Sequence, residues 1–176
     1  MPMLLKVVLV VTALAAAYYD LRVRRIPNWI NVTGVVLGVS LNTYFEHFHG
    51  ALIAGGGLLA ALCIYVPLYA LRGMGAGDVK LMAAIGAIVG PENWFSIFIV
   101  TALLGGAASI TLVLLRRKMG QTMHNVATIV TQLSRGKAPA EQDTALSIHD
   151  KNSLKMPHGA IIASGVCLFL MFHRNV

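Results

Sequence analysis

The stretch LRGMGAGDVKLMAAIGAIVG (residues 71–90) joins a basic, glycine-rich segment to an uninterrupted apolar run, and the single carboxylate Asp78 stands where the two meet. The whole chain of 176 residues is 57% apolar and only 12% charged. That is about half the charged fraction of a soluble domain. A water-soluble fold of this length could not bury so much apolar surface. The sequence therefore predicts an all-α integral membrane protein.

Five further apolar runs accompany this one. The predicted transmembrane helices cover about residues 3–19, 29–45, 51–70, 79–90, 94–115 and 157–172. Runs of roughly 17 to 25 residues span a bilayer, but the twelve residues of 79–90 rise only about 18 Å. We expect that helix to be short and buried among its neighbours, or to continue through Pro91. The prediction is a bundle of six helices forming one membrane-embedded domain over residues 1–176.

The distribution of basic residues predicts the orientation. With the N-terminus outside, the inner segments 20–28, 71–80 and 116–156 hold every lysine and arginine except Lys6 and Arg174. Such a bias is typical of cytoplasmic loops, so it explains the net charge of +7 without a nucleic-acid partner. A cleaved signal peptide is disfavoured, because the positive charge follows the first apolar run and does not precede it. We expect a multi-pass protein of the inner (cytoplasmic) membrane.

The long inner loop, residues 116–156, carries its own helical pattern. Apolar residues recur at positions 119, 123, 126, 130 and 133, the spacing of one apolar stripe. This pattern predicts an amphipathic helix over about 119–135 lying on the inner membrane surface. This segment could take part in gating or substrate docking, but we favour a passive tether.

Small residues recur at helical spacing inside the apolar runs, as in the pairs Gly34/Gly38 and Gly86/Gly90. Such pairs let helix backbones approach closely in lipid, and we favour packing within the chain over a dimer face. Cys63 and Cys167 lie inside apolar runs and are interpreted as small core residues. No cysteine or histidine spacing indicates a metal site, and no cofactor is expected.

A second carboxylate, Asp20, ends the first apolar run in YYDLRVRRIPN (residues 18–28). Taken alone, Asp20 could pair with Arg24, and Asp78 could be a helix N-cap. Two carboxylates at the same predicted membrane boundary instead indicate an acid–base site. Carboxylates within a few ångströms of each other share one proton. We hypothesise that Asp78 is ionised and activates water, while Asp20 carries the proton.

Three segments together resemble the type IV prepilin peptidases, which belong to the Gly-x-Gly-Asp group of membrane aspartyl proteases. The segments are residues 20–28, residues 73–82 and MPHGAIIASG (residues 156–165). The resemblance implies cleavage of the short leader peptide from prepilins or pseudopilins at the cytoplasmic face. It also implies that Asp20 and Asp78 are catalytic and use water as the nucleophile.

The same resemblance suggests supporting residues and partners. Gly75 and Gly77 match the motif glycines that shape the site, and Lys80 matches a motif residue whose role we do not assign. Pro157, His158 and Gly159 match a segment that opens the last span, on the side of the substrate. The implied partners are the prepilin or pseudopilin substrates, membrane lipid, and the pilus or secretion assembly machinery.

This chain lacks one feature of the larger family members, and the difference indicates to which branch of the family it is similar. Those members carry paired Cys-x-x-Cys motifs associated with zinc and with N-methylation, and this chain has none. It is similar to the short, peptidase-only branch that serves tight-adherence or Flp-type pili, so no N-methyltransferase activity is expected. Archaeal preflagellin peptidases and presenilin-like proteases remain alternatives, as does a proton- or ion-coupled transporter with paired carboxylates.

Overall fold

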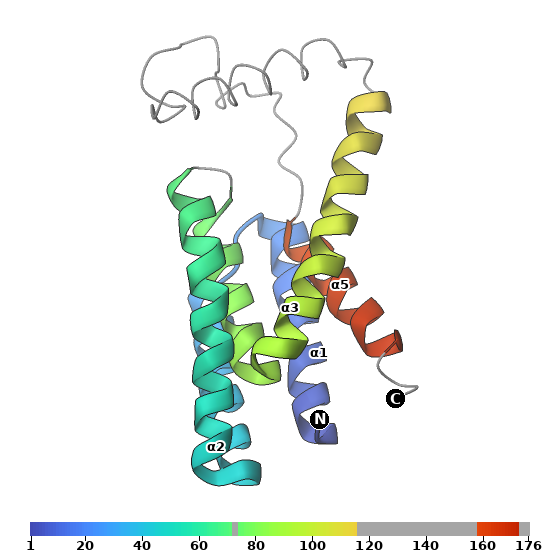
Figure 1. The fold of residues 1–176 in the computed structure, drawn as a ribbon. Helices are drawn as coiled ribbons and strands as arrows, with labels where there is room; N and C mark the ends of the chain where they lie inside the picture. Colours follow the sequence, from blue (N-terminus) through green and yellow to red (C-terminus); the bar gives the residue numbers. More distant parts are fainter. Residues whose placement is uncertain (72–73, 116–157, 173–176) are drawn as a thin grey trace, which may run out of the picture. The chain divides into compact units, whose positions relative to one another are not determined.

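The protein is described by a computed structural model that covers residues 1–71, 74–115 and 158–172. Regular structure in these ranges is entirely α-helical (Figure 1), with the elements α1 (Met3–Val23), α2 (Asn28–Ala70), α3 (Ala76–Leu115) and α5 (His158–Phe172). The first three are long and apolar enough to cross a membrane, and α5 is a shorter apolar helix. The prediction of an all-α fold is therefore confirmed for the described ranges, and the long apolar helices are consistent with a membrane protein.

Both long helices, α2 and α3, contain internal breaks. In α2 the backbone leaves helical geometry at Glu46 and His47, and in α3 it does so at Gly90. Figure 1 shows each helix turning back on itself at its break. The first break lies in the gap predicted between the spans 29–45 and 51–70, and Gly90 is the last residue of the predicted span 79–90. The count of six spans and their orientation in the membrane stay predictions.

The turn in α3 has a local cause in the sequence. Gly90 has a φ of 77°, which glycine adopts without steric cost. Pro91 follows, and proline is favoured in the first turn of a helix. The indole N–H of Trp94 then donates a hydrogen bond of 3.1 Å to the carbonyl oxygen of Met82, which ties the two halves of the turn together. Residues 81–90 are all buried, so the short segment before the turn is a core helix, the first of the two expected possibilities.

This buried part of α3 packs against α2 through small residues. A Cβ atom added at Gly38 would lie 2.8 Å from the backbone carbonyl of Ala87, and one at Gly34 would lie 3.2 Å from the Cβ of Ala84. Asn42 completes the contact with a side-chain hydrogen bond of 3.1 Å to the carbonyl oxygen of Ala87. The expected use of the small residues Gly34 and Gly38 for packing within the chain is confirmed.

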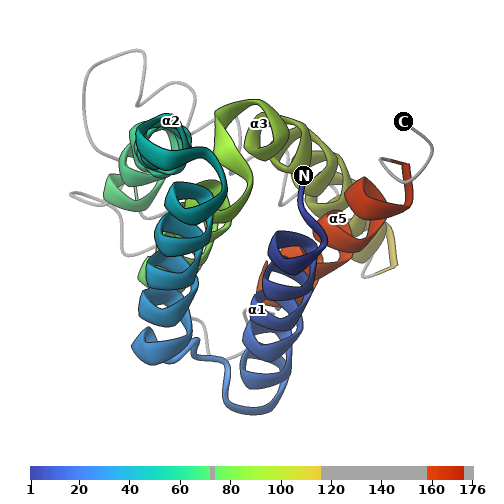
Figure 2. The same ribbon diagram turned by 90° about the horizontal axis from the view of Figure 1, so that it is seen from below.

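The described helices belong to two compact units. Met1–Gly105 and Pro157–Val176 form the first unit, and Gly106–Met156 forms the second, of which the structure describes only the end of α3. Within the first unit α1 lies beside α5 and also contacts α2, and Figure 2 shows α1 and α5 side by side. The predicted amphipathic helix at 119–135 and Pro157 lie outside the described residues. The single-domain prediction stays a prediction.

One sequence interpretation was wrong. Cys63 and Cys167 are both exposed and do not lie in the core. An apolar run in a membrane protein has lipid-facing positions that are as apolar as its interior, so composition alone did not distinguish the two.

Candidate functional site

Asp20 lies in the last turn of α1, where the helix approaches its end at Val23. Arg24 follows in a left-handed conformation, and its backbone N–H donates to the carbonyl oxygen of Asp20 over 2.9 Å. In the described part of the chain no ion pair joins the two side chains. The simple explanation of Asp20 as a salt-bridge partner of Arg24 therefore has no support, and its half-buried carboxylate is available to other groups.

The partner of that carboxylate comes from the far end of the chain. The backbone N–H of Gly159, the second residue of α5, donates a hydrogen bond of 2.7 Å to Oδ2 of Asp20. The first N–H groups of a helix lack partners within it, so Asp20 satisfies one of them. A Cβ atom added at Gly159 would lie 2.9 Å from the Cβ of Asp20. The absence of a side chain at this position is what lets α5 approach Asp20 so closely.

Asp78 is the third residue of α3 and is also half-buried. Its backbone N–H donates to the carbonyl oxygen of Gly75 over 3.1 Å, and its carboxyl group accepts a hydrogen bond from the Gly75 backbone. A Cβ atom at Gly75 would lie 3.1 Å from Oδ2 of Asp78. Gly75 therefore lies directly beside the carboxylate of Asp78.

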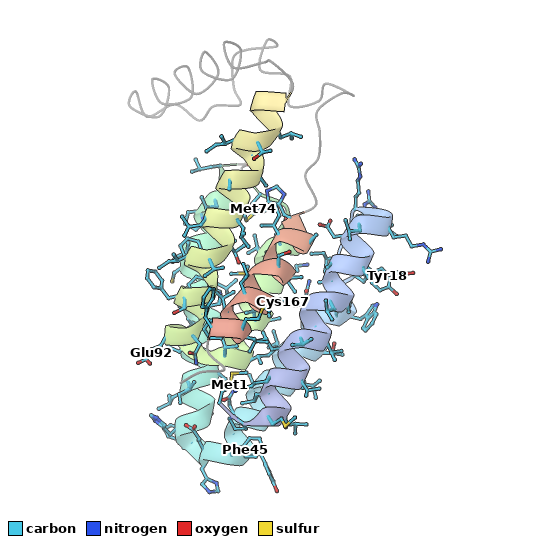
Figure 3. All side chains as sticks on the ribbon, turned by 90° about the vertical axis from the view of Figure 1, so that its right-hand side faces the viewer. Met1, Tyr18, Phe45, Met74, Glu92 and Cys167 are labelled. Carbon is cyan, nitrogen blue, oxygen red and sulfur yellow. The ribbon has the colours of Figure 1, made fainter. Side chains whose placement is uncertain are left out.

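The structure brings the two carboxylates together with the start of α5. The charges of His158 and Asp20 both act on the carboxyl group of Asp78, so α1, α3 and α5 converge at one place. Tyr18 and Met74 are close neighbours of the two aspartates in sequence. Figure 3 shows that both lie away from the end of the molecule at which Phe45 lies. The predicted site residues Asp20, Asp78, His158 and Gly159 thus form a single cluster.

Gly77 and Lys80 have different neighbours. A Cβ atom at Gly77 would meet the side chain of Ile26 at 3.4 Å, and the Lys80 ammonium donates to Oδ1 of Asn28 over 2.9 Å. Both contacts join the segment after α1 to the first turns of α3. Lys80, whose role sequence reasoning left unassigned, therefore links two of the three motif segments.

Sequence reasoning missed Tyr65 of α2. Its side chain is 2% exposed, and the charge of Asp78 acts on its hydroxyl group. The ring of Tyr65 stacks edge-on against Trp94 and Phe98, with centroids 6.1 and 5.8 Å away. The available signal was a hydroxyl-bearing side chain inside an otherwise apolar run. Tyr65 therefore joins an aromatic cluster with Trp94 and Phe98, near enough to Asp78 for the charge of that residue to act on it.

The described residues contain no group of three or more histidine, cysteine, aspartate or glutamate side chains placed to hold a metal ion. The candidate site itself offers two carboxyl groups, each hydrogen-bonded to a backbone N–H group, near an imidazole.

A comparison with protein families identifies a family to which this chain is similar. The model described as "Type IV leader peptidase family" matches residues 7–110, which is more than half of the chain and includes both aspartates. No curated protein and no solved structure matches. The family match ends before α5, so the contact between Gly159 and Asp20 is an observation of the structure alone.

Proposed function

The chain belongs to the type IV leader peptidase family, and from this we propose that it is an aspartic endopeptidase acting on type IV prepilins or pseudopilins. It removes their short leader peptide at the cytoplasmic face of the inner membrane. The observation that carries the proposal is that Asp20, from the end of α1, lies near enough to Asp78, from the start of α3, for their charges to interact.

The proposed chemistry uses the two carboxyl groups as a pair. Carboxyl groups within a few ångströms of each other share one proton, because both cannot ionise together. One of them takes a proton from water as it attacks the scissile carbonyl, and the other donates a proton toward the carbonyl oxygen. No covalent intermediate with the enzyme is needed.

The sequence led to the hypothesis that Asp20 carries the proton while Asp78 is ionised. The surroundings of the two carboxyl groups lead us to change it. Asp20 accepts a backbone N–H from Gly159, and Asp78 accepts one from Gly75. Each carboxyl group thus accepts one backbone N–H, so these contacts do not distinguish which of the two holds the proton. We therefore assign the shared proton to the pair, in place of a proton held by Asp20 alone.

The place of the pair suits a substrate that is cut just before an apolar helix. Asp20 ends a helix long and apolar enough to cross a membrane, and Asp78 begins another. Residues at such helix ends lie at the boundary between lipid and water. The apolar helix of the substrate can then stay in the membrane while its leader, on the aqueous side, reaches the carboxylates. His158, next to Gly159, is proposed as a positioning residue on the substrate side.

Two further parts of the proposal follow from the sequence. No N-methyltransferase activity is proposed, since the chain lacks paired Cys-x-x-Cys motifs. The cleaved subunits would pass to a pilus or secretion assembly machinery. The family match favours a peptidase over the transporter alternative, and carboxylates at helix ends differ from the midplane sites typical of transporters.

A cleavage assay tests this function. Membranes that contain the chain are incubated with a panel of prepilins, pseudopilins and archaeal preflagellins, and the new N-terminus of each product is determined by mass spectrometry. The proposal predicts one cut at the leader boundary of at least one prepilin or pseudopilin, and no cut by the doubly substituted chain Asp20→Asn/Asp78→Asn. Cleavage that persists in the doubly substituted chain would overturn the proposed mechanism. A cut confined to preflagellins would overturn the proposed substrate class.

A further inference from the structure

Tyr65 of α2 carries a polar group to which neither the family match nor the proposed carboxyl chemistry assigns a role. Its side chain is 2% exposed, and the hydroxyl group of a buried tyrosine usually has a hydrogen-bond partner. Among residues 1–71, 74–115 and 158–172 no hydrogen bond involves this hydroxyl group, and its oxygen is not one of the enclosed polar atoms that lack a partner. The hydroxyl group is therefore accessible and still able to donate a hydrogen bond.

The second part of α2 and the first part of α3 pack in an antiparallel register. A Cβ atom added at Gly90 would lie 2.6 Å from the side chain of Ile53. Gly57 and Gly86 lie in backbone contact, because a Cβ atom added at either would overlap the carbonyl group of the other. The contacts thus advance by four residues along α2 as they go back by four residues along α3.

This register places Tyr65 opposite Asp78, since each lies eight residues beyond the second of these contacts, toward the end at which α2 ends and α3 begins. The charge of Asp78 accordingly acts on Tyr65. The ring of Tyr65 packs against Trp94 and Phe98, and the indole N–H of Trp94 is bonded to the carbonyl oxygen of Met82, one turn after Asp78. The aromatic cluster therefore holds the phenol in place beside Asp78 before any substrate binds.

The proposed reaction has room for such a donor. A carbonyl oxygen can accept two hydrogen bonds, and the carboxyl pair supplies one of them, from the carboxyl group that donates its proton. Negative charge develops on this oxygen as water attacks, and a fixed donor in a buried site stabilises that charge more than it stabilises the substrate. A phenol suits this role because it ordinarily keeps its proton up to about pH 10. Lys80, another donor near the start of α3, is hydrogen-bonded to Asn28 instead.

We propose that Tyr65 is a third catalytic residue, whose hydroxyl group donates a hydrogen bond to the scissile carbonyl oxygen as water attacks. This role presupposes the peptidase function proposed above. Tyr65 gives up no proton: one proton of the water passes to the ionised carboxyl group, the other carboxyl group protonates the carbonyl oxygen, and the phenol only stabilises the charge that develops there.

Tyr65→Phe tests the role, because it removes the hydroxyl group and leaves the ring. We expect kcat for cleavage of a leader-bearing prepilin to fall about a hundredfold, the usual effect of removing one such donor. KM and the midpoint of thermal unfolding should stay close to those of the parent chain, since the hydrogen bond strengthens only in the transition state. Tyr69→Phe is the matched control, one turn further along α2 and 50% exposed, and should leave all three values unchanged.

Trp94→Phe shows what a packing defect in the same cluster looks like. It removes the hydrogen bond to Met82 and part of the ring contact with Tyr65, so it should lower the midpoint of thermal unfolding. A loss of kcat in Tyr65→Phe that comes with a similar fall in its midpoint would overturn the proposal, because the ring packing would then explain it. An unchanged kcat, or a raised KM with kcat unchanged, would overturn it as well.

The assay also separates this role from the peptidase function. If the parent chain cleaves, the doubly substituted chain Asp20→Asn/Asp78→Asn does not, and Tyr65→Phe cleaves at the parent rate, only the role of Tyr65 is overturned. A parent chain that cleaves no substrate of the panel, or a doubly substituted chain that still cleaves, overturns the peptidase function and the role of Tyr65 with it.

Discussion

The N–H of Gly159 lies 2.7 Å from Oδ2 of Asp20, although 139 positions separate the two residues in sequence. This contact joins the start of α5 to the end of α1, and α5 thereby becomes part of the proposed catalytic site. The family match stops at residue 110, so it does not reach this contact.

Gly159→Ala is predicted to impair leader cleavage. The added Cβ would lie 2.9 Å from the Cβ of Asp20, so Asp20 or α5 must move. We expect a loss of about tenfold or more in kcat/KM, which corresponds to about 1.4 kcal/mol of transition-state stabilisation. The control is Gly55→Ala, at which an added Cβ meets nothing within 4 Å. Equal activity of the two variants would contradict the proposed role of Gly159.

The two motif glycines are predicted to differ. An added Cβ at Gly75 would lie 3.1 Å from Oδ2 of Asp78, whereas one at Gly77 would lie 3.4 Å from the side chain of Ile26, which is ordinary contact. Gly75→Ala should therefore lower kcat/KM more than Gly77→Ala does. Steady-state cleavage assays of both variants at matched membrane levels check this order. The reverse order would mean that Gly77 is the glycine that shapes the site.

Gly38→Ala is predicted to destabilise the bundle. The added Cβ would lie 2.8 Å from the backbone of Ala87, and overpacking of this kind costs about 1–3 kcal/mol. Thermal unfolding in detergent should show a lower midpoint than the parent chain. Gly56→Ala is the matched control in the same helix, since its Cβ would meet only Pro91 at 3.8 Å. If the two midpoints agree, the close packing of α2 on α3 is not as described.

The hydrogen bond between Lys80 and Asn28 (2.9 Å) is predicted to couple the two motif segments. Lys80→Ala and Asn28→Ala should each reduce cleavage, and the double variant should lose less than the product of the two single losses. Residues in contact give such non-additive effects. A double-mutant cycle on kcat/KM measures the coupling. Independent, multiplicative losses would show that Lys80 acts through another partner.

Much of the architecture was predictable because membrane helices are long and apolar. The runs at 3–19 and 29–45 coincide with α1 and the first part of α2, and the short run before Gly90 proved to be a buried helix. The turns were harder, because a gap of a few polar residues does not tell where the backbone breaks. The positive φ of His47 has no sequence signal that we recognise.

The sequence indicated which residues to consider for the candidate site, but it indicated few of the contacts that those residues make. Asp20 and Asp78 stood out because carboxylates are rare in apolar sequence. The partner of Lys80 and the nearness of Tyr65 to Asp78 were not predictable, since they depend on which faces of the helices meet. The same reason explains Cys63 and Cys167, whose apolar surroundings in sequence suit a lipid-facing position as well as a core position.

The most direct test of the account is the cleavage rate of the single variants Asp20→Asn and Asp78→Asn, measured on one leader-bearing prepilin in membranes. Glu92→Gln, which changes an exposed carboxylate at the turn in α3, is the matched control. The account predicts that each aspartate variant is inserted at the parent level yet cleaves nothing measurable, while Glu92→Gln cleaves like the parent. Full cleavage by either aspartate variant would contradict the proposal that the two carboxylates act as a catalytic pair.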